Sequence, residues 1–227
     1  MSTYLIIDLL VLGAPLLMTL FFKKKLGTLN FKAFLRAFLL VGSFFIIWDI
    51  IFTYIGVWSF SKQYTLGHNL IGLPLEEILF FFAIPFASLA LFELINSMFK
   101  DRVIKFNRKI LLSLSLILIL SSFYLLFLFK IYTGTVLLLL GLLLLWYYRC
   151  NKEGIIQKNQ LLFFLLSFIP FFIVNSILTG LPVVSYSETF NTGIRISTIP
   201  IEDFIYSFLM LAMFLIVYQE ELKKHSS

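Results

Sequence analysis

Cysteine, histidine and charged residues are all scarce in this chain. It has 227 residues, with one cysteine, Cys150, and two histidines, His68 and His225. A single cysteine excludes an internal disulfide and a cysteine metal cluster, and two isolated histidines form no metal-binding motif. The chain also lacks a glycine-rich dinucleotide motif and a phosphate-binding loop. We therefore expect no metal site and no nucleotide cofactor.

Low charge is matched by a high apolar content. Charged residues make up 13% of the chain, whereas 60% of the residues are hydrophobic. A soluble domain of this length could not bury so much apolar surface, and about 20 apolar residues are enough to cross a bilayer. The sequence therefore predicts an all-α integral membrane protein with about seven transmembrane helices. They are expected near residues 3–22, 33–56, 74–96, 110–129, 132–149, 160–180 and 200–219.

The basic residues fall unevenly on the two sides of this arrangement. If the N-terminus lies outside, 15 of the 18 lysines and arginines lie on the cytoplasmic side, and only Lys62, Lys130 and Arg195 lie outside. Such a bias sets the orientation of membrane proteins. It predicts a multi-pass protein of the cell membrane with an outer N-terminus and a cytoplasmic C-terminus. Because the basic residues report topology, no nucleic-acid partner is expected.

Acidic residues are the scarcest charge, yet four of the twelve form two adjacent pairs. Each pair follows a proline and opens a long apolar segment: Glu76 and Glu77 after Pro74, and Glu202 and Asp203 after Pro200. Proline favours the first turn of a helix. Carboxyl groups at membrane depth are costly and are a functional-site hypothesis by default. We predict that these four acids are catalytic.

The two motifs indicate an internal repeat. A shift of 126 residues places Pro74 on Pro200 and also aligns two polar pairs upstream, Asp49 and Thr53 with Asn175 and Thr179. Each pair is spaced i, i+4 and so shares a helix face. We expect a first three-helix repeat at 1–99, a connecting helix within 100–131 and a second repeat at 132–227. Three spans plus one connector make the repeats parallel, so both acid pairs start on the same side.

Several further residues are expected to support the acids. If the halves pack face to face, Asp49 and Asn175 join the two acid pairs, with Thr53 and Thr179 beside them. Phe80 and Tyr206 lie one helical turn after the first acid of each pair, and aromatic rings can stabilise a cation. Adjacent residues point about 100° apart on a helix, so one acid of each pair is expected to face the cavity.

The loops before the acid pairs, near 57–73 and 181–199, carry aromatic residues. Trp58 and Tyr186 are among them. Their expected place is the aromatic belt at the membrane interface. Loops that fold over a cavity are the alternative.

The motifs together resemble the membrane-embedded lycopene cyclase family, over nearly the whole chain from Tyr4 to about Tyr218. The resemblance rests on Pro-Leu-Glu-Glu-Ile-Leu-Phe-Phe at 74–81, Pro-Ile-Glu-Asp-Phe at 200–204, and Asn-Ser-Ile-Leu-Thr-Gly at 175–180. It is closest to the fused form, in which both half-domains share one polypeptide.

The resemblance implies cyclisation of the linear ends of lycopene to β-ionone rings, giving γ-carotene and then β-carotene. This is a non-redox isomerisation by acid and base through a carbocation. Lycopene cyclases of the other type bind a flavin through a dinucleotide motif that is absent here, so no flavin is expected. The expected partners are lycopene and related carotenoids, the lipid bilayer and other enzymes of the carotenoid pathway.

Three other functions remain open on the sequence alone. A proton-coupled transporter also has intramembrane acids and repeats. A cyclase of another terpenoid would share the chemistry, and a non-catalytic carotenoid-binding subunit would share the apolar pocket.

Overall fold

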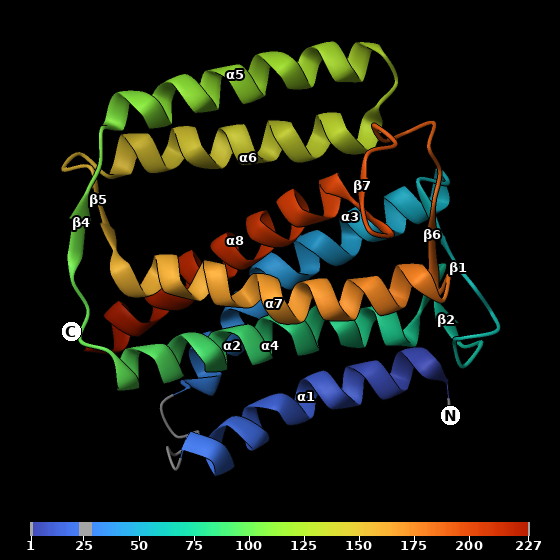
Figure 1. The fold of residues 1–227 in the computed structure, drawn as a ribbon, viewed down its shortest axis with the longest axis horizontal. Helices are drawn as coiled ribbons and strands as arrows, with labels where there is room; N and C mark the ends of the chain where they lie inside the picture. The colour runs from blue at the N-terminus through green and yellow to red at the C-terminus, as the bar shows by residue number, and fades with distance from the viewer. Residues whose placement is uncertain (1, 23–28, 227) are drawn as a thin grey trace.

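The computed structural model describes residues 2–22 and 29–226, and helices dominate it (Figure 1). The helices are α1 (Thr3–Phe22), α2 (Phe31–Ala37), the π-helix η2 (Phe38–Gly42), α3 (Ser43–Tyr54), α4 (Leu75–Met98), α5 (Arg108–Phe127), α6 (Ile131–Cys150), α7 (Lys158–Gly180) and α8 (Ile201–Ser226). In the described residues, α2, η2 and α3 form one continuous span, and α4 to α8 each form another. These six are long and apolar enough to cross a membrane, whereas α1 contributes a shorter apolar stretch, Thr3–Met18. The predicted all-α membrane fold is confirmed.

Short strands, which the sequence did not predict, join the loops at both ends of the bundle. They are β1 (Trp58–Phe60), β2 (Asn69–Leu70), β3 (Leu73–Pro74), β4 (Val103–Lys105), β5 (Ile155–Gln157), β6 (Val184–Tyr186), β7 (Arg195–Ile196) and β8 (Ile199–Pro200). They form four antiparallel pairs: β1 with β6, β2 with β3, β4 with β5, and β7 with β8. Strands this short carry too little alternation to be recognised in sequence.

The β1–β6 pair joins the two loops that precede the acid pairs. Ser59 lies opposite Ser185, and Trp58 lies opposite Tyr186. In Figure 1 these strands lie at the end of the bundle where α4 and α8 begin. We call this the carboxylate end, because both acid pairs open their helices there.

The backbone connections at the carboxylate end recur 126 residues apart. The hairpin that pairs Asn69 with Pro74 is matched by one that pairs Arg195 with Pro200. The amide of Ser61 donates to the carbonyl of Val183 at 2.9 Å, and the amide of Ser187 donates to that of Val57 at 2.8 Å. Two similar halves would give this pattern. The boundaries of the repeats stay a prediction.

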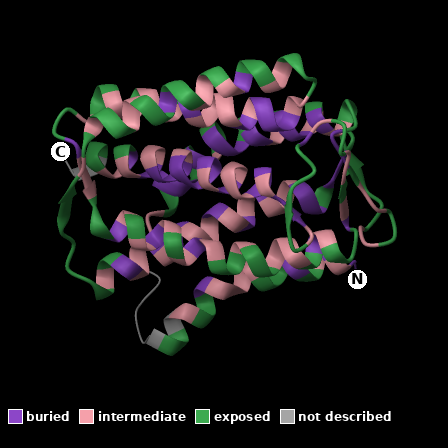
Figure 2. Ribbon diagram, turned by 45° about the horizontal axis from the view of Figure 1, so that its top comes forward, coloured by how far each residue is buried: buried purple, intermediate pink, exposed green. Residues whose placement is uncertain are grey.

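The core lies between the helices that carry the acids. Buried residues concentrate on α4, on α8 and on the span that ends in α3 (Figure 2). The connecting helix α5 instead packs beside α6 at one edge (Figure 1). A Cβ on Gly141 would lie 2.7 Å from Ile119 Cγ1, so glycine permits this close approach.

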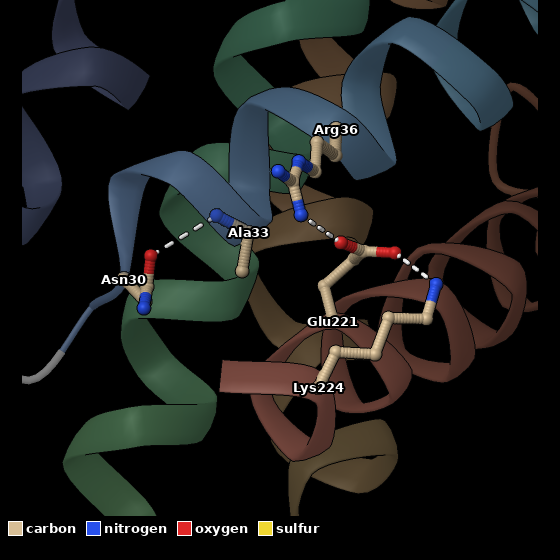
Figure 3. A network of polar contacts seen from close by, with 5 residues as sticks. All are labelled: Asn30, Ala33, Arg36, Glu221 and Lys224. Atoms are coloured by element: carbon tan, nitrogen blue, oxygen red, sulfur yellow. Dashed lines mark hydrogen bonds and ion pairs between the residues drawn. The ribbon is translucent and has the colours of Figure 1, made fainter. Parts of the chain in front are cut away.

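At the opposite end of the bundle, Glu221 on α8 forms one ion pair with Arg36 on α2 and a second within α8 (Figure 3). Glu221 Oε2 lies 2.5 Å from Arg36 Nη1, and its Oε1 lies 2.6 Å from Lys224 Nζ. The Asn30 side chain caps α2 by accepting from the amide of Ala33 at 3.0 Å. Glu221 lies far along α8 from the acid pair Glu202 and Asp203. These contacts therefore stabilise the fold.

Cys150 allows a direct test of the predicted orientation. It is exposed at the end of α6, away from the carboxylate end. A membrane-impermeant maleimide should leave it unlabelled in intact cells and label it after permeabilisation. A Cys150→Ser, Glu188→Cys variant moves the thiol to the exposed loop between β6 and β7, and it should be labelled in intact cells. Labelling of Cys150 without permeabilisation would show that the orientation is opposite to the predicted one.

Candidate active site

A cavity of about 160 Å³ lies beneath the paired loops at the carboxylate end. Its lining comes from α1, α3, α4, α6, α7, α8 and the paired strands β1 and β6. The second acid of each pair, Glu77 on α4 and Asp203 on α8, lines it. Each half of the chain therefore contributes the second acid of its pair to a common cavity.

Asp203 is held by two phenol hydroxyls. Tyr132 Oη donates to Asp203 Oδ1 at 2.6 Å, and Tyr186 Oη donates to Oδ2 at 2.7 Å. Burial raises the pKa of the Tyr186 phenol well above its ordinary value, and the nearby Asp203 charge raises it further. Tyr186 therefore remains a hydrogen-bond donor at physiological pH, and donors of this kind stabilise a carboxylate anion.

Glu77 has a single phenol partner. Tyr4 Oη donates to Glu77 Oε2. Tyr4 and Tyr132 lie at equivalent places in the two halves, because the amide of Tyr4 donates to Tyr64 O at 3.1 Å and that of Tyr132 donates to Phe190 O at 2.9 Å. Each half thus supplies one tyrosine to its own acid. Tyr186 gives Asp203 a second phenol donor.

The first acid of each pair faces away from the cavity and closes its own loop. Glu76 Oε1 accepts from the amide of Leu66 at 2.6 Å and from Ser2 Oγ at 2.7 Å. Glu202 Oε1 accepts from the amide and the hydroxyl of Thr192, each at 2.8 Å, and from Thr133 Oγ1 at 2.6 Å. Neither acid belongs to the lining of the cavity.

Of the residues predicted to support the acids, most line the cavity and one does not. Asp49, Asn175, Thr179, Phe80 and Tyr206 line the cavity. Asp49 is 2% exposed, and within the described chain its Oδ2 has no hydrogen-bond partner, nor does Tyr206 Oη.

Thr53 lies outside the cavity lining. Its Oγ1 accepts from Trp58 Nε1 at 3.0 Å. It therefore positions Trp58, whereas its repeat partner Thr179 contacts the cavity and donates to Asn175 O at 2.7 Å.

Aromatic rings surround the Asp203 side of the cavity. The Tyr206 ring lies 5.1 Å from both Phe45 and Trp48 and 6.3 Å from Tyr132, measured between ring centroids. Trp58 is 6% exposed and, like Tyr186, lines the cavity. For these two residues the expected interface belt is wrong, because the β1–β6 pairing folds their loops inward.

The tyrosines that hold the acids were missed from the sequence. Tyr4 and Tyr132 are 128 residues apart, whereas the acid pairs are 126 apart. A comparison at one fixed offset does not align them. A search that allowed a two-residue slip between the first helix of each repeat and its acid motif would have found the pair.

The chain matches the lycopene cyclase family over residues 1–95 and 129–220. It belongs to the lycopene cyclase family. The unmatched segment between these ranges contains α5, which lies outside the cavity lining. No curated protein and no solved structure gave a match.

The cavity presents carboxyl groups among aromatic rings. Among the described residues, no group of three or more His, Cys, Asp or Glu side chains is placed to hold a metal ion.

Glu202 provides a test of the division between the two acids of a pair. Glu202→Ala removes the acceptor of three hydrogen bonds and leaves the buried Thr133 hydroxyl without this acceptor. We expect a loss of at least about 2 kcal/mol in stability, seen as a lower thermal midpoint in detergent. Glu202→Gln keeps a carbonyl acceptor and should retain most of this stability. Glu188→Ala, on the exposed loop, is the matched control, and a Glu202→Ala midpoint equal to that of the control would contradict the loop-closing role.

Proposed function

We propose that this lycopene cyclase converts the linear ends of lycopene to β-ionone rings, giving γ-carotene and then β-carotene. The observation that carries the proposal is the pairing of Glu77 and Asp203, one from each half, in a cavity lined by aromatic rings. The reaction needs an acid, a base and protection of a carbocation from water.

The proposed reaction balances without a redox step. A carboxylic acid protonates C2 of the terminal C1=C2 bond, which leaves a cation at C1. The electrons of the C5=C6 bond form the C1–C6 bond, and the charge moves to C5. A carboxylate then removes the proton from C6, and the C5=C6 bond forms again in the ring. The enzyme gains one proton and loses one.

The hydrogen bonds favour Asp203 as the base and Glu77 as the acid. Each carboxylate oxygen of Asp203 accepts from a phenol, which stabilises the anion, whereas Glu77 has a donor on one oxygen only. In a site with several buried carboxyl groups, not all can be ionised together. The group with fewer donors is the one that keeps a proton to give.

The aromatic rings suit the cationic intermediate. Tyr206 and Trp58 line the cavity on the Asp203 side, and Phe80 lines it on the Glu77 side. The face of an aromatic ring attracts a cation by about 0.5–2 kcal/mol. Because an aromatic ring is a weak nucleophile, it stabilises the cation without forming a bond to it.

The test is expression in a bacterium that accumulates lycopene. We expect lycopene to be replaced by cyclised products, with β-carotene identified by chromatography and absorption spectrum. Unchanged lycopene in cells that hold well-expressed, membrane-inserted protein would overturn the proposal. Products with ε or γ rings would retain cyclisation but correct the carbon that loses its proton.

Two conservative variants test the acid and the base. Glu77→Gln and Asp203→Asn keep the size of each side chain but remove its ability to exchange a proton. Each should lower ring formation by about 100-fold or more. Glu93→Gln, on the same helix as Glu77 but hydrogen-bonded to Tyr218 at 2.7 Å, is the control and should remain active. Full activity of either active-site variant would remove that residue from the proton transfers.

A further inference from the structure

The cavity extends far beyond the two carboxyl groups. On α4 its lining runs from Glu77 to Leu91, and on α1 it runs from Tyr4 to Met18. Fourteen residues of helix span about 21 Å. The cavity is thus elongated along the helices, from the carboxylate end toward the opposite end of the bundle.

Among the described residues, the far part of the cavity lies beside α4, whereas α8 lines it only as far as Leu211. Ala87 and Ser88 on α4 line the cavity, and 126 residues later Met213 and Phe214 stand at the same places on α8. Phe214 is 0% exposed, and Met213 packs against the buried core around it. Small side chains therefore leave room beside α4 where large ones fill the space beside α8.

Helices α7 and α3 differ in the same way. Val174 and Leu178 on α7 line the cavity, whereas the matching positions on α3 are Trp48 and Phe52. Both aromatic residues belong to the main buried core. The space between α1, α4 and α7 is an open channel, and the corresponding space between α6, α8 and α3 is closed by packing.

Polar groups that can act on a substrate lie at one end of this channel. Asp49, with its buried and unpartnered Oδ2, lines the same outer part as Glu77 and Asp203. Farther along α4 the lining is apolar apart from the Ser88 hydroxyl. The arrangement has a reactive head and a long apolar tail.

We propose that the channel between α1, α4 and α7 holds the polyene chain of the substrate while one end reacts between Glu77 and Asp203. This proposal rests on the proposed function. It gives the protein one site that takes the two ends of a carotenoid in turn, since the matching space beside α8 is filled. Ala87 and Ser88 then determine whether a long polyene can enter.

The test fills the channel with the residue that the other half carries. Ser88→Phe places at α4 the side chain found at Phe214. Ser113→Phe makes the same change at an exposed position on α5 and is the matched control. Each variant is expressed in lycopene-accumulating cells, and two quantities are measured: cyclised product per amount of protein, and lycopene that remains bound to purified protein.

We expect Ser88→Phe to lower both ring formation and bound lycopene by at least about tenfold, and Ser113→Phe to change neither. Ring formation by Ser88→Phe at the unaltered level would overturn the proposal. So would a loss of ring formation with lycopene binding unchanged, because the channel would then not hold the chain. If Ser88→Phe fails to accumulate in the membrane, Ala87→Leu decides by the same two measurements.

Failure of the proposed function is distinguishable from failure of this inference. An unaltered protein that forms no rings would overturn the cyclisation, and the binding measurement would still test the channel. If the unaltered protein and the Ser88→Phe variant are both fully active, the proposed cyclase function stands and the proposed channel is wrong.

Discussion

A carboxyl group at the buried start of a membrane-spanning helix is unfavourable unless hydrogen-bond donors meet it, and the carboxylate end of this protein is organised around that requirement. Glu76 and Glu202 each take an amide from the preceding loop and a hydroxyl from a neighbouring segment. These bonds fold the loops back over the helix starts. The paired loops then cover the cavity and bring Trp58 and Tyr186 into its lining.

Two adjacent acids suit this design because successive helical residues point about 100° apart. The first acid can turn to the loop while the second turns to the cavity. Glu77 and Asp203 meet phenols instead of amides. In the proposed reaction they exchange protons with the substrate, while their neighbours Glu76 and Glu202 hold the loops.

The two acid pairs follow loops with matching backbone contacts, but the helices around them differ in side chains. Rings from Phe45, Trp48 and Phe52 pack the Asp203 side, whereas Val174 and Leu178 leave the Glu77 side open. Identical halves would leave equal space beside α4 and beside α8. Large residues on α8 and α3 instead fill the space on one side, so the elongated part of the cavity lies beside α4.

The sequence by itself determined the membrane helices, the positions of the acid pairs and the family, because hydropathy, proline placement and motif spacing are local properties. It also identified Asp49, Asn175 and Tyr206 as companions of the acids, since one offset aligns the repeats. Tertiary structure alone decided which acid of each pair faces the cavity, which phenols hold Glu77 and Asp203, and which half is open. These depend on the rotation and packing of helices far apart in the chain, and the two-residue slip between Tyr4 and Tyr132 hides part of that packing from any single alignment.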